Sequence, residues 1–109
     1  MFIRTVAETA GTDLDVPWGN GQSRRLVVKR DGMGFAVAYT LVLAGSESLL
    51  EYKNHFEACY CISGEGEVED MAGTRYPIQP GTIYVLNEHD KHYLRANVDM
   101  VLLSVFNPP

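Results

Sequence analysis

Three residues of types that bind metal ions lie where short strands would direct them into the interior of a small barrel: Glu57, Tyr84 and His92. Glu57 opens an alternating run that ends near Gly66, and the other two lie on the arms of an expected hairpin at residues 80–94. A carboxylate, a phenol and an imidazole among apolar neighbours are costly to bury unless they bind something. They predict one metal ion and an enzyme that acts on a small molecule. Taken alone, Glu57 is equally compatible with a buried ion pair, and Tyr84 with ordinary packing.

Short strands are the elements that would position these residues. Apolar residues recur at a period near two, and glycine or proline interrupts the pattern every 8 to 15 residues or so. The pattern predicts strands at residues 2–6, 24–29, 34–43, 47–52, 57–63, 65–70, 75–78, 83–86, 91–96 and 100–106. It predicts turns at residues 31–32, 44–45, 63–64, 72–73 and 80–81, and one turn of helix within residues 6–11. The predicted fold class is all-β.

About ten short strands in 109 residues indicate a sandwich or a closed barrel, because closure removes the exposed edges that promote aggregation. The favoured form is a cupin double-stranded β-helix, a jelly-roll-like barrel that spans residues 1–109 as a single domain. Alternation places Cys59 and Cys61 on the same strand face as Glu57. We expect both thiols to be reduced core residues without a chemical role, since side chains two apart on one strand form a poor disulfide.

Composition excludes several classes of partner. The formal net charge is -5, and Arg24, Arg25, Lys29 and Arg30 are the only clustered cations, so we expect no binding to nucleic acid. The apolar stretches are too short to span a bilayer, and the sequence after Met1 lacks the layout of a signal peptide. We therefore expect a cytoplasmic protein without a membrane partner.

The cupin sequence motifs sharpen the expected metal site. The first motif supplies two histidines and then a glutamate ahead of a glycine, and the second supplies one more histidine after a Pro-Gly turn. Glu57 and His92 match the glutamate and the last histidine, whereas Leu50 and Tyr52 occupy the two earlier histidine positions. A site with three histidine ligands is therefore excluded.

Beyond these motifs, the chain resembles the ectoine synthase family, a branch of the cupins. The resemblance is carried by five ordered blocks, which are Asp31–Phe35, Tyr52–Ile62, Gly64–Asp70, His89–Ala96 and Val105–Pro109. They extend across most of the chain from Ser23 onward, so the series is a more specific signal than any single motif.

The resemblance implies an enzyme that closes N-γ-acetyl-L-2,4-diaminobutyrate into ectoine, a cyclic amidine osmolyte, with loss of water. It also implies an iron(II) ion held by Glu, Tyr and His, which match Glu57, Tyr84 and His92. Zinc and manganese stay open, because oxygen-rich ligands with one imidazole suit several divalent ions. Cupin barrels often pair through edge strands, so we expect a homodimer.

Further site residues follow from the resemblance. Arg25 matches an arginine that would bind the substrate carboxylate, and Thr40 matches a threonine in contact with the substrate. Tyr52 matches a tyrosine near the reacting amine, which implies substrate binding and a catalytic part in proton transfer. Phe106 matches an aromatic wall of the pocket, and Ser104 stands where the family has a cysteine beside the substrate.

Other residues near this site are given supporting roles. His55 and His89 are expected to be structural or to support the metal ligands from behind. Arg24 and Arg25 alternate along one strand, so only one of them is expected to reach the interior. The small side chains that share one face of residues 36–42 would leave room for a ligand.

Three departures from the family pattern favour an alternative function. Family members carry a tryptophan where this chain has Gly21, with Trp18 three residues earlier, and a cysteine where it has Ser104. They also continue beyond Asn107–Pro109 into an acidic tail that covers the site, and a missing cover would leave the pocket wetter. The alternative is a non-catalytic or weakly catalytic cupin that binds ectoine or a related small molecule. A metal cupin acting on a sugar or amino-acid derivative is a third interpretation.

Overall fold

The structure, a computed structural model, describes residues 1–109 and consists mainly of strands. One short helix, α1 (Val6–Thr9), and one 3-10 turn, η1 (Lys29–Asp31), accompany them, and no helix is long and apolar enough to cross a membrane. The strands are β1 (Asp15–Pro17), β2 (Gly21–Val27), β3 (Ala36–Val42), β4 (Glu47–Leu50), β5 (Phe56–Ser63), β6 (Gly66–Asp70), β7 (Arg75–Ile78), β8 (Ile83–Leu86), β9 (His92–Ala96) and β10 (Met100–Asn107). The all-β prediction is confirmed.

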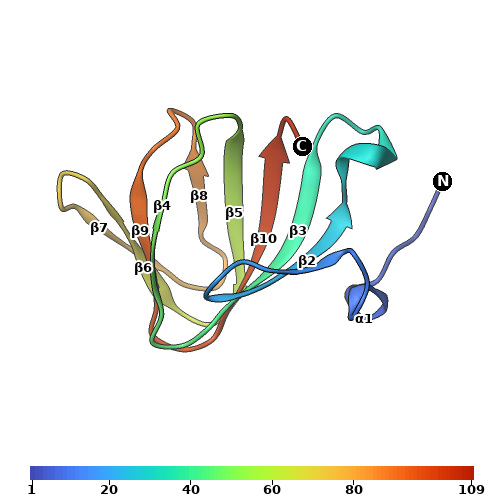
Figure 1. The fold of residues 1–109 in the computed structure, drawn as a ribbon. Coiled ribbons are helices and arrows are strands. Elements are labelled where there is room, and N and C mark those ends of the chain that lie inside the picture. Colours follow the sequence, from blue (N-terminus) through green and yellow to red (C-terminus); the bar gives the residue numbers. More distant parts are fainter.

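The strands form two antiparallel sheets that face each other (Figure 1). The six-stranded sheet has the order β1-β2-β3-β10-β5-β8, and the four-stranded sheet has the order β4-β9-β6-β7. The last strand, β10, lies between β3 and β5, so Phe106 is opposite Ala36 on one side and Glu57 on the other. This interleaving brings residues that are distant in the sequence to one end of the barrel.

One predicted strand is absent and one strand was not predicted, besides shifts at several strand ends. Residues 2–6 do not form a strand, because Thr5 caps helix α1 in a reciprocal arrangement with Glu8, whose side chain accepts a hydrogen bond from the Thr5 amide. Strand β1 was not predicted, since it is three residues long, ends at Pro17 and pairs only with β2. The predicted turn of helix is confirmed in α1.

The expected hairpin at residues 80–94 is wrong. Strand β8 pairs with β5 in the six-stranded sheet, where Tyr84 is opposite Cys59, whereas β9 pairs with β4 and β6 in the other sheet. Residues 87–91 therefore cross from one sheet to the other. The result is that Tyr84 and His92 approach from opposite sheets, which the sequence pattern alone did not indicate.

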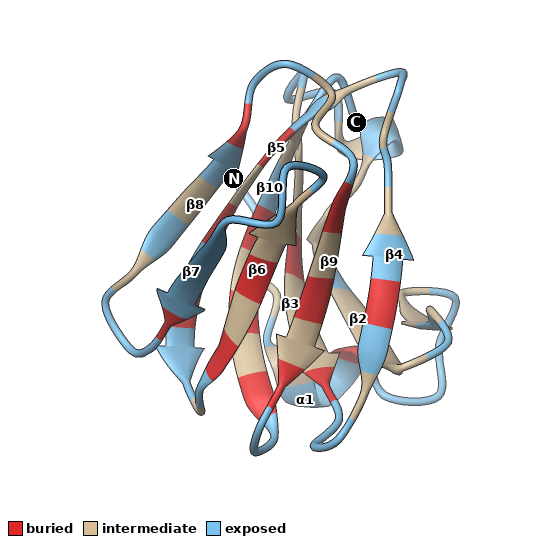
Figure 2. Cartoon of the chain, turned by 90° about the vertical axis from the view of Figure 1, so that its left-hand side faces the viewer, coloured by how far each residue is buried: buried red, intermediate tan, exposed pale blue.

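Apolar side chains fill the end of the barrel where β5 finishes and β10 begins. The buried cluster there consists of Val42, Cys59, Cys61, Val68, Ile78, Leu94, Ala96, Met100 and Leu102. Figure 2 shows the alternation that produces it, with buried bands along β6 and β9 separated by less buried ones. Both thiols are free and buried, as predicted. Gly64 allows the two chain segments at this end to approach closely, since a Cβ at this position would lie 2.1 Å from the Asp99 carbonyl oxygen.

Candidate active site

The opposite end of the barrel contains a cavity of about 590 Å³. One wall is the inner face of β3, where Ala36, Ala38 and Thr40 line the cavity. These small side chains leave the space that was expected on this strand face. The start of β5 and the end of β10, which lie beside β3 in the same sheet, complete this wall. The cavity therefore occupies the part of the barrel interior that the apolar cluster does not fill.

Glu57 lines this cavity and carries a buried carboxyl group without a cationic partner. Its side chain lies on β5 beside β10, and the residue is 7% exposed. Burial raises the pKa of Glu57 to about 7, and a hydrogen bond with the Cys59 thiol offsets only part of that increase. The ion pair that would have been the ordinary explanation for Glu57 is absent among its contacts. A carboxylate in this position therefore lacks a counter-charge.

Tyr84 separates the main cavity from a second one of about 270 Å³, and its side chain lines both. Burial raises the pKa of the Tyr84 phenol well above its usual value, with the Cys59 and Glu57 side chains adding to the increase. Its ring meets that of His92 at a centroid distance of 6.3 Å. Tyr84 thus lies next to both other members of the predicted metal site.

His92 lines the second cavity and not the main one. Its Nδ1 lies 2.8 Å from the Asp90 carbonyl oxygen, which can only accept, so Nδ1 carries the proton. The other ring nitrogen, Nε2, is buried and has no hydrogen-bond partner. An imidazole held in this tautomer presents an unshared electron pair, which is the form that binds a metal ion.

The residues present fit a divalent ion, with an oxygen-rich set of donors. No group of three or more His, Cys, Asp or Glu side chains could hold a metal, so a site built from Glu57 and His92 needs the phenol of Tyr84. The orphaned Nε2 atom and the unpaired carboxyl group would each be explained by an ion beside Tyr84, the residue that lines both cavities. The sequence predicted the same three donors, and the metal site stays a prediction.

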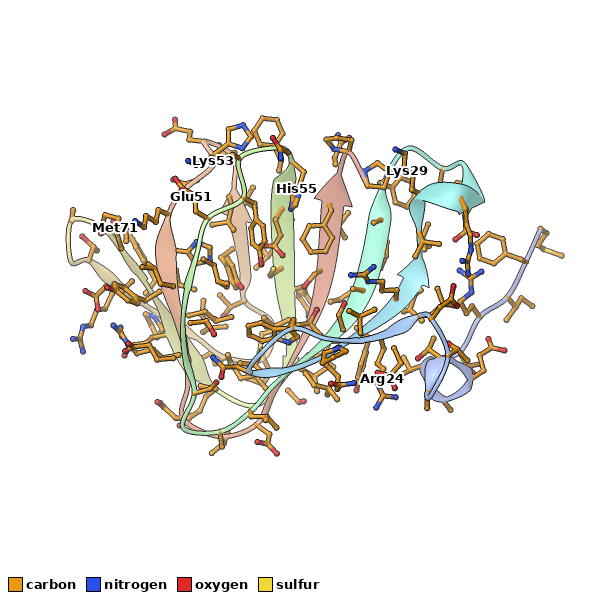
Figure 3. All side chains as sticks on the ribbon, viewed as in Figure 1. Arg24, Lys29, Glu51, Lys53, His55 and Met71 are labelled. Carbon is orange, nitrogen blue, oxygen red and sulfur yellow. The ribbon has the colours of Figure 1, made fainter.

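Arg25 lines the main cavity at a place where the residue is also exposed to solvent, whereas its neighbour Arg24 is half-buried and does not line the cavity. Arg24 Nε lies 2.9 Å from a carboxylate oxygen of Asp15, and Figure 3 shows this side chain at the lower edge of the molecule. The expected alternation on β2 is confirmed. The guanidinium of Arg25 is therefore available to an anion inside the cavity.

Two hydroxyl groups and a thiol link neighbouring strands across the cavity wall. The Thr40 and Ser104 hydroxyl oxygens are 3.0 Å apart, and the Cys59 sulfur lies 3.5 Å from Ser104. Ser104 is 2% exposed, so its hydroxyl is engaged with these two neighbours. Cys59, to which the sequence assigned no chemistry, also lines the cavity.

Aromatic rings gather at the mouth of the cavity. His55 stacks on Tyr52 with centroids 4.9 Å apart and meets Phe106 edge-on at the same distance. Burial raises the pKa of Tyr52 to about 12, so its phenol stays protonated near neutral pH. His55 Nε2 is buried without a partner, and Figure 3 places this residue at the upper end of the barrel.

Sequence reasoning gave His55 a supporting role, yet the residue lines the cavity itself. His55 lies in the bend at residues 53–55, just before β5 begins at Phe56, so alternation along the strand did not indicate its place at the cavity. His89 does not line the cavity; its Nδ1 lies 2.8 Å from the Tyr52 carbonyl oxygen, and its ring stacks on Phe56.

Comparisons with known proteins agree with this geometry. A family model described as ectoine synthase matches residues 1–109. The chain is 50% identical to an L-ectoine synthase of Saccharophagus degradans over 110 residues, covering 100% of this chain and 83% of the relative. It is also similar to the crystal structure of an ectoine synthase from P. lautus, with a TM-score of 0.97, 50% identity, and coverage of 100% and 79%. An RmlC-like cupin from Shewanella frigidimarina is 17% identical with a TM-score of 0.74, covering 91% of this chain and 86% of that protein. The cupin fold is thereby confirmed.

Proposed function

Because this chain belongs to the ectoine synthase family, a group of hydro-lyases, we propose that it closes N-γ-acetyl-L-2,4-diaminobutyrate into ectoine in a metal-dependent reaction. The α-nitrogen forms a bond to the acetamide carbon, and the bond from that carbon to its oxygen breaks. Two of the three protons of the α-ammonium leave with the oxygen as water, and the product is a cyclic amidinium. The reaction needs no oxidant or reductant.

Glu57, Tyr84 and His92 are the residues that would hold the metal ion. A divalent ion, which we expect to be iron(II), with zinc or manganese as alternatives, would act as a Lewis acid on the acetamide oxygen. The observation that carries this assignment is the buried Nε2 atom of His92, which has no protein partner although the tautomer exposes its electron pair. The uncompensated carboxyl group of Glu57 supports it independently.

Arg25 would bind the carboxylate of the substrate. It is a cation on the cavity wall formed by β2, and a guanidinium can donate two parallel hydrogen bonds to a carboxylate. Thr40, held by Ser104 at 3.0 Å, would contact the chain between the two reacting groups. Fixing both ends of a flexible substrate brings the amine close to the acetamide carbon and lowers the entropic cost of ring closure.

Tyr52 would relay one of these protons, donating its phenolic proton to the departing oxygen and recovering one from the α-ammonium. Its phenol lines the cavity and stays protonated because burial raises its pKa to about 12. A protonated group can stabilise negative charge that develops on oxygen and then transfer the proton as water forms. The Phe106 ring, whose centroid is 6.3 Å from that of Tyr52, would exclude water from this side.

The partner expected for this single cupin domain is a second copy of the chain. The outer face of the six-stranded sheet exposes a continuous set of apolar side chains, Tyr60, Ile62, Ile83, Val85 and Val105. The outer face of the other sheet is polar instead, with Arg95 contacting Glu47, Glu67 and Glu69 at 2.7 to 3.0 Å. Strand β8 is also a free edge, so a homodimer would form through the β5 and β8 region. A cytoplasmic location and the absence of nucleic-acid binding stay predictions.

Anaerobic incubation of the iron-loaded protein with N-γ-acetyl-L-2,4-diaminobutyrate tests the proposed reaction. We expect a product lighter by one water that co-elutes with ectoine in mass spectrometry. The same protein treated with a chelator should form none. Binding of ectoine in calorimetry without any turnover by the iron-loaded protein would contradict the enzyme and favour a binding module.

A further inference from the structure

Trp18 is the only tryptophan of the chain, and the turn between β1 and β2 carries it. The turn is short and well held: the Trp18 amide donates to the Gly21 carbonyl oxygen at 3.2 Å, and the Leu43 amide donates to that of Asn20 at 2.8 Å. The side-chain amide of Asn20 also donates to the Glu47 carbonyl oxygen at 3.0 Å, which ties the turn to the four-stranded sheet. The backbone that presents Trp18 is therefore fixed from both sheets.

The indole of Trp18 points inward from this turn. Its Nε1 donates to the Leu41 carbonyl oxygen at 3.0 Å, and the ring packs against the buried apolar cluster. The rest of the ring surface lines the main cavity. The single polar atom is thus satisfied by the backbone, and the apolar part of the indole is left for whatever occupies the cavity.

Gly21 is the residue that makes this arrangement possible. A Cβ at position 21 would lie 1.7 Å from the Leu41 carbonyl oxygen and 3.1 Å from Trp18 Nε1. No side chain fits there while β2 and β3 stay paired, because the obstructing atom belongs to the backbone. The lack of a side chain at Gly21 lets the Leu41 carbonyl group approach, and the Trp18 indole donates its hydrogen bond to that same carbonyl oxygen.

The charges of the cavity show what the indole would face. The carboxylates that line it are Asp13 and Glu57. Asp13 is paired at 2.8 Å with Arg30 near the surface, and Glu57 is a proposed metal ligand. A ligand with a positively charged nitrogen group thus finds no free carboxylate in the cavity. Aromatic rings provide the remaining means of stabilising such a cation. Tyr52, His55 and Phe106 pack on one another at the mouth, and Tyr84 is a proposed metal ligand, which leaves the Trp18 indole.

We propose that Trp18 is a specificity-determining residue that contacts the ligand and stabilises its cationic nitrogen group against the ring. The inference rests on the proposed function, because the ligand class it names is a small zwitterion with a carboxylate and an amidinium or ammonium. Arg25 takes the carboxylate, and the indole takes the opposite charge. Trp18 contributes to binding in this way while the chemistry takes place elsewhere in the cavity.

Fluorescence tests the contact directly, since all tryptophan emission comes from this residue. Titrating ectoine into the wild-type protein should shift the emission and reduce its quenching by acrylamide, at the same midpoint that calorimetry gives for binding. Heat of binding without any change in emission or quenching overturns this inference alone. Absence of heat overturns the proposed function as well, so the two failures are distinguishable.

Kinetics of substituted proteins provide the second readout. Trp18→Ala should raise KM about tenfold, which is the size of one lost cation–π contact, and change kcat much less. Trp18→Phe keeps a ring and should give an intermediate KM, which also covers the case in which Trp18→Ala does not fold. Tyr93→Ala removes an aromatic ring from the outer face of β9 and is the matched control, with KM expected to stay unchanged. An unchanged KM in a folded Trp18→Phe protein whose melting temperature alone falls would show a purely structural role.

Discussion

Tyr84 and His92 come from opposite sheets, and their rings meet with centroids 6.3 Å apart and planes inclined at 60°. Strand β8 carries the first and strand β9 the second, and residues 87–91 connect them across the barrel. An ion bound by both side chains would join the two sheets at the end of the barrel that the apolar cluster leaves open. Metal binding should therefore stabilise the fold.

Removing the metal should lower the melting temperature of the protein. An ion present at about 100 times its dissociation constant stabilises the folded state by about 2.7 kcal/mol, because it does not bind the unfolded chain. Differential scanning calorimetry with and without a chelator measures the effect. His92→Ala should melt at the same temperature in both conditions; a full metal response in that variant would place the ion elsewhere.

Loss of one proposed ligand should abolish stoichiometric metal. Glu57→Ala and His92→Ala are each expected to weaken metal affinity more than about 100-fold, since even groups that only support ligands account for about 10- to 100-fold. Elemental analysis after purification measures the content. Glu65→Gln changes an exposed carboxylate at the start of the next hairpin and should retain the wild-type metal content. Retention of metal in both ligand variants would refute the site.

The metal-free protein should lose stability as the pH rises from about 4.5 to about 7. Burial raises the Glu57 pKa from 4.5 to about 7, so folding favours its protonated form. This contribution is fully present below the unfolded value and is lost as the pH rises through the folded value, an effect of up to about 3 kcal/mol. Urea unfolding between pH 4 and 8 measures it. The Glu57→Gln protein should lack this part of the slope, and a parallel slope in both proteins would show that Glu57 is not its source.

Adjacent arginines on β2 should behave differently when they are substituted. Arg25→Ala should raise KM about 10- to 100-fold, the range for a lost hydrogen bond to a charged group. Arg24→Ala removes only the partly exposed pair with Asp15 and should change stability by about 1 kcal/mol or less, with KM unchanged. Steady-state kinetics and urea unfolding of both proteins check this contrast. Equal effects on KM would mean that Arg25 does not bind the substrate carboxylate.

A charge on the outer face of the six-stranded sheet should dissociate the dimer. Ile83→Glu places a carboxylate on the exposed β8 edge, where burial against a second copy would be costly. Light scattering coupled to size exclusion should give the mass of one chain. Leu49→Glu, on the outer face of the four-stranded sheet, is the matched control and should leave the dimer intact. Dissociation by the second substitution and not the first would move the interface to the other sheet.

The sequence by itself determined the strand content and the direction of most side chains. Alternation is a local property of a strand, so it separated Arg24 from Arg25 and placed Glu57 on the same face as Cys59 without any knowledge of the sheets, while the family resemblance selected Arg25 for the cavity. Residue type at those positions then indicated metal chemistry. The Thr5 cap of helix α1 is also local, and the pattern T-x-x-E would have revealed it.

Only the tertiary structure decided which residues meet. Periodicity cannot assign a strand to a sheet, so it paired Tyr84 with His92 in a hairpin, whereas the fold places them on facing sheets. It could not show that Trp18 takes the space left by Gly21, because that depends on the approach of the Leu41 carbonyl group from β3. Nor could it show that His55 Nε2 and His92 Nε2 lack partners, since hydrogen-bond satisfaction is a property of the assembled interior.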